Sequence, residues 1–192
     1  MESPIRIVGI SGSLRAGSHN TAALRAAAEM APDGVEIEIF DLNGLPMFNA
    51  DTEADDLRHP KVAALREAIG EADGVLIATP EYNYSVTGAL KNAIDWASRG
   101  GADAPLNGKP AAVLGAGGRF GTVRAQMHLR EILRHNDVRL VGRPEVMIDR
   151  ASTKFEAGRL VDERHRDQVR RLVEALAALV RERHRSLTLQ PC

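Results

Sequence analysis

The sequence has almost no cysteine: the one cysteine among its 192 residues is Cys192. This excludes an internal disulfide framework and a cysteine-based metal cluster, and it is typical of a reducing compartment. A thiol at this position has no fixed surroundings, so we assign it no catalytic role. The six histidines are scattered, and no cluster of Cys, His or carboxylate residues has the spacing of metal ligands. We therefore predict no metal site.

The sequence also lacks an excess of charge of one sign. Its 25 basic and 26 acidic residues give a formal net charge of −1, so no overall field favours nucleic acid or an anionic membrane as a partner. It has no run of 18 apolar residues and no signal peptide, so we expect a cytoplasmic protein without membrane contact. The length and the apolar content of 44% fit a single domain over residues 1–192.

Apolar strands alternate with helical segments along the chain. Three runs are apolar enough to be buried on both faces of a sheet, whereas residues 35–40 alternate apolar and acidic residues as an edge strand does. Strands are expected at 5–10, 35–40, 75–79, 111–114 and 138–148, and helices at 21–30, 61–70, 88–99, 123–136 and for about six turns from 162. Gly142 is a point where the last strand can break, and residues 149–161 are predicted to be irregular.

Right-handed crossovers between these strands give an α/β fold with three layers, αβα. With the alternating strand at the edge, the expected arrangement is a flavodoxin-like five-stranded parallel sheet of order 2-1-3-4-5. In such a sheet, the loops after the first, third and fourth strands open on one edge, where open α/β sheets bind their ligands.

The first of these loops, residues 11–20 (SGSLRAGSHN), contains three serines, two glycines and an arginine. It joins a strand to the amino end of a helix, where free backbone N–H groups and the helix dipole attract an anion. Asn20 is the expected N-cap. The hydroxyls of Ser13 and Ser18, the Asn20 amide and the charge of Arg15 suit a phosphate. The alternative is a serine-glycine turn with a solvated arginine. No Walker sequence follows, so a nucleoside triphosphate is disfavoured.

The other two loops are equally unusual. Residues 80–85 (PEYNYS) hold both tyrosines of a sequence that is only 4% aromatic, so a flat ring can stack there while groups around Glu81 and Asn83 contact its polar edge. Residues 115–121 (GAGGRFG) are glycine-rich, which lets a bulky ligand approach the backbone. A phosphate site, a stacking surface and bare backbone together fit flavin mononucleotide (FMN).

Two other nucleotide and hydrolase patterns are disfavoured. Gly115 and Gly117 lie between a strand and a helix, as in a dinucleotide-binding fingerprint, but the third glycine, Gly121, comes one residue late. The motif also follows the fourth strand instead of the first, which argues against a Rossmann-type NAD site. There is no G-x-S-x-G elbow of a Ser–His–Asp hydrolase.

Four segments, in matching order, resemble the NADPH-dependent FMN reductase-like family, which includes flavodoxin-fold quinone, chromate and azo reductases. They are residues 12–20 (GSLRAGSHN), 79–85 (TPEYNYS), 88–96 (GALKNAIDW) and 124–126 (RAQ). The resemblance implies that the first segment holds the FMN phosphate, that residues 80–83 wrap the ring, and that residues 116–117 close its other edge. The expected cofactor-binding residues are Ser13, Leu14, Arg15, Ser18, His19, Asn20, Pro80, Glu81, Tyr82, Asn83, Tyr84, Ala116 and Gly117.

The resemblance also implies an activity and an assembly. NADPH or NADH reduces bound FMN, which then reduces a quinone, an azo dye, chromate or free FMN. Residues 45–48 resemble a loop that borders the active site in the family. Relatives are homodimers or homotetramers, and Arg124 and Glu145 match polar positions used at the tetramer contact, although Met127 stands where relatives often carry tyrosine.

No side chain is assigned as an acid or base, because the cofactor carries the chemistry. Trp96, two turns beyond the tyrosine loop, is expected to pack in the core instead of stacking on a flavin. The main alternative function is a flavodoxin-type electron carrier that docks redox proteins, although a net charge of −1 gives little sign of the acidic face this needs. A third is a flavin-binding sensor that uses the arginine-rich C-terminal helix to contact a partner.

Overall fold

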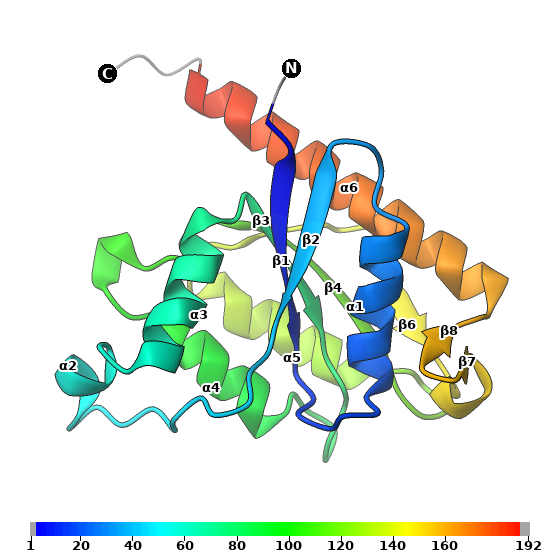
Figure 1. Ribbon diagram of the computed structural model, residues 1–192, viewed down its shortest axis with the longest axis horizontal. Helices are drawn as coiled ribbons and strands as arrows, with labels where there is room; N and C mark the ends of the chain where they lie inside the picture. Colours follow the sequence, from blue (N-terminus) through cyan, green and yellow to red (C-terminus); the bar gives the residue numbers. More distant parts are fainter. Residues whose placement is uncertain (1–2, 189–192) are drawn as a thin grey trace.

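The computed structural model describes residues 3–188, which form a parallel sheet between two layers of helices (Figure 1). The strands of the sheet lie in the order β2-β1-β3-β4-β5, and β6 also pairs with β4. Every one of these pairs is parallel. The strands are β1 (Ile5–Ser11), β2 (Val35–Phe40), β3 (Gly74–Ala78), β4 (Pro110–Ala116), β5 (Arg139–Leu140), β6 (Val146–Ile148), β7 (Phe155–Glu156) and β8 (Arg159–Leu160). The predicted flavodoxin-like strand order is confirmed.

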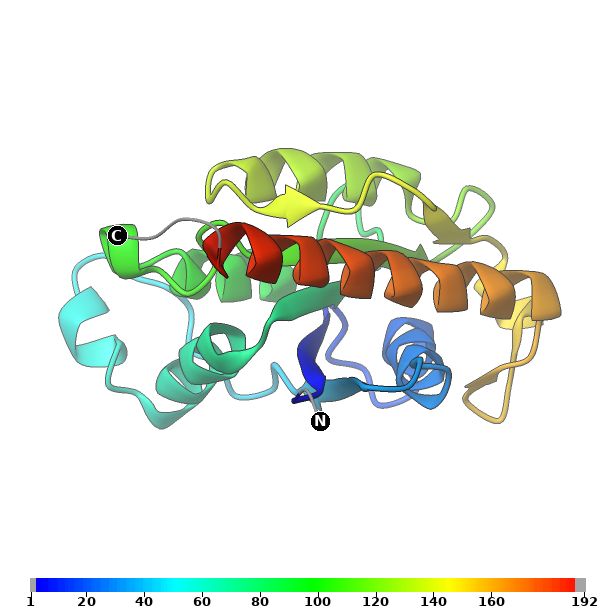
Figure 2. The same cartoon turned by 90° about the horizontal axis from the view of Figure 1, so that it is seen from above.

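The central strands are apolar throughout because both faces of the sheet are covered. In β3, for example, Leu76 packs in one core cluster with helices α1 and α6, whereas Val75 and Ile77 pack in the other with α3, α4 and α5. Helix α6 extends along much of the molecule (Figure 2). The helices are α1 (His19–Glu29), α2 (Glu53–Asp56), α3 (Pro60–Glu71), α4 (Gly88–Ala97), α5 (Val123–Arg134) and α6 (Glu163–Thr188). None of them, within the described residues, is both long and apolar enough to cross a membrane.

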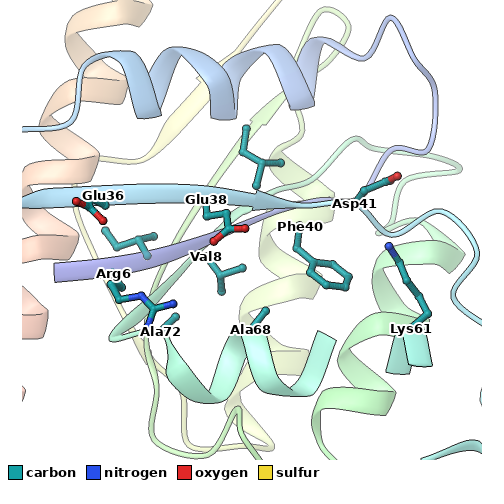
Figure 3. A pocket seen from close by; sticks show the side chains of 11 residues that line it. Arg6, Val8, Glu36, Glu38, Phe40, Asp41, Lys61, Ala68 and Ala72 are labelled. Carbon is teal, nitrogen blue, oxygen red and sulfur yellow. The ribbon is translucent and has the colours of Figure 1, made fainter. Parts of the chain in front are cut away.

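Strand β2 lies at the edge of the sheet, as its alternating pattern predicts. It pairs with β1, and its acidic residues Glu36 and Glu38 are exposed. Between this edge and α3 lies a pocket of about 180 Å³, whose side chains include Arg6 and Lys61 as well as these two acids (Figure 3). None of the expected cofactor-binding residues lines it.

The last predicted strand is broken in the region of Gly142, as the sequence allowed, into two short strands, β5 and β6, which pair with opposite ends of β4. Gly142 and Pro144 lie between them, and proline has no N–H to donate to a ladder. Two other details differ from the sequence-based expectation. Residues 149–161, predicted to be irregular, contain a one-turn 3₁₀ helix (Ala151–Thr153) and the β7–β8 hairpin. The one-turn helix α2 was not predicted.

Candidate functional site

The loops after β1, β3 and β4 meet at one edge of the sheet and enclose a cleft of roughly 300 Å³. This volume lies at the lower end of the range for small-molecule pockets. Nine of the thirteen residues expected to bind the cofactor line it: Ser13, Arg15, Ser18, His19, Asn20, Pro80, Tyr82, Ala116 and Gly117. Leu14 lines a pocket shared with residues 39–43, and Glu81, Asn83 and Tyr84 line a cavity shared with residues 118–121.

Ser18, not Asn20, is the N-cap of α1, which corrects the sequence-based prediction. The Ser18 Oγ accepts a hydrogen bond from the backbone N–H of Thr21 at 3.2 Å, and Asn20 is already the second residue of the helix. Either residue type suits a cap, so propensity could not separate them. Because Ser18 acts in this bond as an acceptor, its hydroxyl hydrogen is free to be donated to a ligand.

Asn20 connects the first loop to the third. Its Nδ2 donates to the backbone oxygen of Ala116 at 3.0 Å, and its Oδ1 accepts from the backbone N–H of Ala116 at 2.9 Å. Asn20 is buried, so this double hydrogen bond holds the two loops in register across the base of the cleft. One amide hydrogen takes no part in the pair and can serve a ligand.

The first loop offers positive charge that no acidic residue neutralises. Arg15 is exposed, and within the described residues no carboxylate lies within 4 Å of its guanidinium. The loop is shaped by Ser11, whose Oγ accepts from the Thr21 hydroxyl at 2.9 Å and from the Ser13 N–H at 3.3 Å. A charged donor beside hydroxyls at a helix amino end fits an anionic phosphate.

His19 forms an uncharged part of the same wall. Burial, together with the positive charge of Arg15, lowers the pKa of His19 below its ordinary value. Its ring stacks on Phe155 of β7 with 4.8 Å between ring centroids. The β7–β8 hairpin therefore supports the phosphate loop from behind.

The second loop is a tight two-residue hairpin that points both tyrosines outward. Tyr82 and Ser85 exchange both backbone hydrogen bonds at 3.0 Å, and Asn83 and Tyr84 between them have φ of 50° and 66°. Two successive positive φ values define the turn type that matches strand twist, but such a conformation is unusual for tyrosine. Tyr82 at the cleft is 55% exposed and Tyr84 is 68% exposed, so the cleft is open to solvent beside the hairpin.

Glu81 fixes this hairpin to α5. Its carboxylate accepts from Arg124 Nη1 at 2.8 Å and from the backbone N–H groups of Arg124 and Ala125 at 2.9 and 3.2 Å. Burial alone raises the pKa of Glu81, but these hydrogen bonds outweigh it and lower the pKa below its ordinary value. The charged carboxylate also lies at the positive end of the helix dipole. The Glu81 side chain thus positions the loop, leaving its backbone to contact a ligand.

The glycines of the third loop serve mainly its own folding. A Cβ on Gly115 would lie 1.9 Å from the Oγ1 of Thr122, and one on Gly117 would lie 2.2 Å from the backbone oxygen of Gly121. At Gly118, by contrast, an added Cβ would meet no atom within 4 Å. Glycine is therefore required at positions 115 and 117 by the folding of the loop back on itself, and the approach of a ligand to this backbone stays a prediction.

Sequence reasoning missed the fourth wall of the cleft, which consists of Arg150, Ala151 and Ser152. The N–H of Arg150 donates to the oxygen of Gly118 at 2.8 Å, and that of Ala151 donates to Gly117 at 2.9 Å. This segment follows β6, whose carboxyl end lies at the same sheet edge as the other loops. The signal available in the sequence was a run of polar residues directly after this strand, at the same kind of position as the three loops that were predicted.

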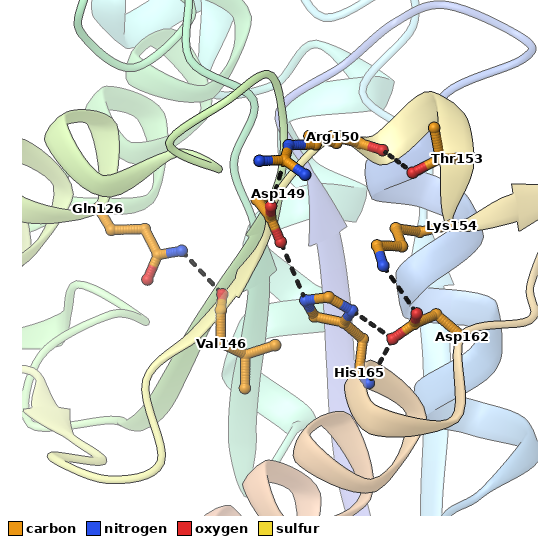
Figure 4. Close-up of polar contacts among 8 residues, drawn as sticks. All are labelled: Gln126, Val146, Asp149, Arg150, Thr153, Lys154, Asp162 and His165. Carbon is orange, nitrogen blue, oxygen red and sulfur yellow. Dashed lines mark hydrogen bonds and ion pairs between the residues drawn. The ribbon is translucent and has the colours of Figure 1, made fainter.

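A charged network holds this wall from behind (Figure 4). His165 is buried; its Nδ1 lies 2.6 Å from Asp162 Oδ1 and its Nε2 lies 3.6 Å from Asp149 Oδ1. Lys154 donates to Asp162 at 2.8 Å, and this bond, with those from His165, lowers the Asp162 pKa to about 2. The network ties Asp149, next to Arg150, to the start of α6.

Trp96 packs in the core, as predicted. Its side chain is buried, and its Nε1 donates to the oxygen of Pro46 at 2.8 Å, as does Asn92 Nδ2. Asn92 Oδ1 accepts from the N–H of Phe48 at 2.8 Å. These bonds fix the loop at residues 45–48, whereas Met47 points outward and is largely exposed.

Within residues 3–188, no group of three or more His, Cys, Asp or Glu side chains is arranged to hold a metal ion.

Comparison with known proteins agrees with this geometry. The family model described as NADPH-dependent FMN reductase matches residues 5–153. An NAD(P)H-dependent FMN reductase from Pseudomonas aeruginosa is 51% identical, covering 94% of this chain and 98% of its own length. An NAD(P)H:quinone oxidoreductase from Solanum tuberosum is 45% identical, covering 91% of this chain and 92% of its own length.

Among solved structures, the flavoenzyme NAD(P)H:(acceptor) oxidoreductase FerB from Paracoccus denitrificans has a TM-score of 0.83 at 32% identity, covering 92% of this chain and 97% of that one. The family expected from the sequence motifs is confirmed. This chain belongs to the NADPH-dependent FMN reductase family.

Proposed function

We propose that this protein is an FMN-dependent NAD(P)H oxidoreductase whose acceptor is a quinone or a similar small molecule. The observation that carries the proposal is the cleft itself, which is lined both by Arg15, an arginine without an acidic partner, and by the exposed Tyr82 of the hairpin. Relatives named as FMN reductases and quinone oxidoreductases support the same reaction class. An azo dye, chromate or free FMN fits the same open site.

The described residues fit FMN. The guanidinium of Arg15 and the hydroxyls of Ser13 and Ser18 would hold the phosphate, and Pro80 and Tyr82 would border the ring. When bound, FMN supplies hydride transfer to and from its ring. Backbone atoms of residues 116–118 and 150–152 line the facing side, so polar edges of the ring can be contacted without further side chains.

The chain's own contribution is positioning. Asn20 joins the first and third loops, and Glu81 joins the second loop to Arg124, so the walls keep their spacing when a ligand enters. Hydride transfer needs its reacting atoms about 3–3.5 Å apart, and the exposed hairpin leaves room for a second planar molecule to stack. No side chain is required to donate or accept a proton.

A homodimer or homotetramer is part of the proposal. Met127 on α5 is 65% exposed, and it lies one turn from Arg124, the position at which the family resemblance places a subunit contact. The rings of Tyr84 and Phe120, whose centroids lie 4.2 and 5.6 Å from the Arg124 guanidinium, are exposed as well, and exposed apolar side chains gathered in one region favour association. We keep the cytoplasm as the proposed location, on the basis of the cysteine-poor composition.

The test is to replace the proposed phosphate ligand. A charge-assisted hydrogen bond contributes about 1.5–3 kcal/mol, so Arg15→Ala should weaken FMN binding about 10- to 150-fold. The measurement is the dissociation constant from flavin fluorescence during titration. Arg164→Ala, an exposed arginine on α6 that does not line the cleft, is the matched control. An unchanged FMN constant in Arg15→Ala would contradict the assignment.

Turnover separates the enzyme from the electron-carrier alternative. The purified, FMN-loaded protein should oxidise NADPH or NADH steadily when a quinone is supplied. A flavodoxin-type carrier or a flavin-binding sensor would hold FMN but show almost no such oxidation.

A further inference from the structure

A second cavity, of about 620 Å³, adjoins the cofactor cleft at its ring-binding end. It is lined by Glu81, Asn83 and Tyr84 from the hairpin and by residues 118–121 and Arg124 from the segment that enters α5. Gly118 lines both this cavity and the cleft, so the two spaces are neighbours at the third loop. We call this second space the Arg119 cavity.

The charge in the Arg119 cavity is unbalanced. Arg124 is paired with Glu81 at 2.8 Å, so that pair contributes no net charge. Arg119 is exposed, and in the described part of the chain no carboxylate lies within 4 Å of it. The remaining positive charge therefore belongs to Arg119, and an anion is the ligand group it attracts.

The same cavity presents two flat apolar faces. Tyr84 and Phe120 are 68% and 58% exposed, unusual for rings of this size in a monomer. The Arg124 guanidinium lies 4.2 Å from the Tyr84 ring centroid and 5.6 Å from that of Phe120, so it holds both rings at the rim. Arg119 lies 5.4 Å from the Phe120 centroid. An anionic group and a planar ring of one ligand can thus bind side by side.

We infer that Arg119 binds a phosphate of the nicotinamide dinucleotide. The inference rests on the proposed function, in which Arg15, which lines the cleft but not the Arg119 cavity, is committed to the phosphate of FMN. The nicotinamide must stack at the ring-binding end to bring its reacting carbon within about 3–3.5 Å. Its phosphates then extend past the Tyr82 hairpin, and the Arg119 cavity is the adjoining space with a free cation.

Two phosphate groups of the dinucleotide have this chemistry: the 2′-phosphate, which only NADPH carries, and the pyrophosphate, which both coenzymes carry. A guanidinium binds either through paired N–H groups. The two are distinguished by comparing coenzymes, since loss of a 2′-phosphate contact weakens one and loss of a pyrophosphate contact weakens both.

The experiment uses the FMN-loaded protein and the oxidised coenzymes, which bind without reacting. Dissociation constants for NADP⁺ and NAD⁺ are measured from the change in flavin absorbance for wild type, Arg119→Gln and Arg119→Lys. Arg119→Gln should weaken coenzyme binding about 10-fold or more. Arg119→Lys keeps the positive charge and should therefore retain part of the wild-type affinity. Arg134→Gln, an exposed arginine at the far end of α5, is the matched control.

The outcomes separate the inference from the proposed function. Weakened NADP⁺ binding alone assigns Arg119 to the 2′-phosphate, and equal weakening of both coenzymes assigns it to the pyrophosphate. Unchanged constants for both coenzymes, with FMN still bound, overturn the inference and leave the proposed function standing. A variant that loses FMN, or that changes only its oligomeric state in size-exclusion chromatography, also overturns the inference. A wild-type protein that never binds FMN overturns the proposed function.

Discussion

At the scale of single residues, the site depends on side chains that bond to backbone. Asn20 occupies both polar groups of Ala116, and Glu81 receives two backbone N–H groups and one guanidinium at the start of α5. Both side chains fix the distance between loops that are far apart in the sequence. A ligand then binds a site that is already formed, which lowers the entropic cost of binding.

The glycines of the third loop give a prediction at this scale. Gly115→Ala should lower the free energy of unfolding by about 1–3 kcal/mol, because the added methyl meets Thr122 and the backbone oxygen of Thr79, which cannot move freely. Gly118→Ala, in open space, should change it by less than about 0.5 kcal/mol. Urea unfolding of the two variants checks this. Equal stability of both would mean that the loop relaxes around the new methyl.

At the scale of elements, α6 and the segment after β6 depend on each other. Asp162 precedes α6, accepts from the backbone N–H of His165 at 3.1 Å, and also binds Lys154. His165 in turn reaches Asp149, beside the Arg150 wall of the cleft. The C-terminal helix thus supports a wall of the candidate cleft as well as one face of the sheet.

This network predicts a dependence of stability on pH. The Asp162 pKa is lowered to about 2 from its usual 3.8, so its ionised form is stabilised in the folded state. That stabilisation is complete above about pH 4 and is lost as the pH falls towards 2. Asp162→Asn should therefore be less stable than wild type at pH 7, and the gap should narrow between pH 4 and pH 2.

Urea unfolding across this pH range is the measurement. Asp51→Asn, at an exposed position away from the network, is the control and should follow wild type throughout. A gap between Asp162→Asn and wild type that stays constant down to pH 2 would show that the Asp162 charge does not contribute.

At the scale of the whole molecule, the cleft exists only in the folded chain. Its walls come from the loops after β1, β3, β4 and β6, which the parallel sheet brings to one edge. A ligand that needs all four walls binds the folded state and not the unfolded one, so it must raise stability.

The corresponding prediction concerns FMN itself. At about 100 times its dissociation constant, FMN should raise the free energy of unfolding by about 2.7 kcal/mol. Riboflavin at the same concentration should stabilise less, because it has no phosphate for Arg15 and Ser18 to bind. Thermal unfolding with each ligand tests this. Riboflavin that stabilises as well as FMN would show that the first loop does not hold the phosphate.

The sequence by itself determined the fold and the position of the first loop, because both depend on local patterns. Strands that are apolar on both faces must be buried in a parallel sheet, and the alternation in residues 35–40 places β2 at an edge. The serines and Arg15 are contiguous and follow β1, so their place beside one another at the sheet edge was predictable without coordinates, although the N-cap of the next helix was not. The same holds for the two tyrosines of the hairpin.

Only the tertiary structure decided which residues meet across the cleft. The Asn20–Ala116 pair, the Arg150 wall and the link from His165 to Asp149 join positions far apart in the chain or on separate elements. The roles of Gly115 and Gly117 likewise depend on Thr122 and Gly121 folding back onto them. Local propensity carries no information on such contacts, because each is fixed by how strands and helices pack and not by neighbouring residues.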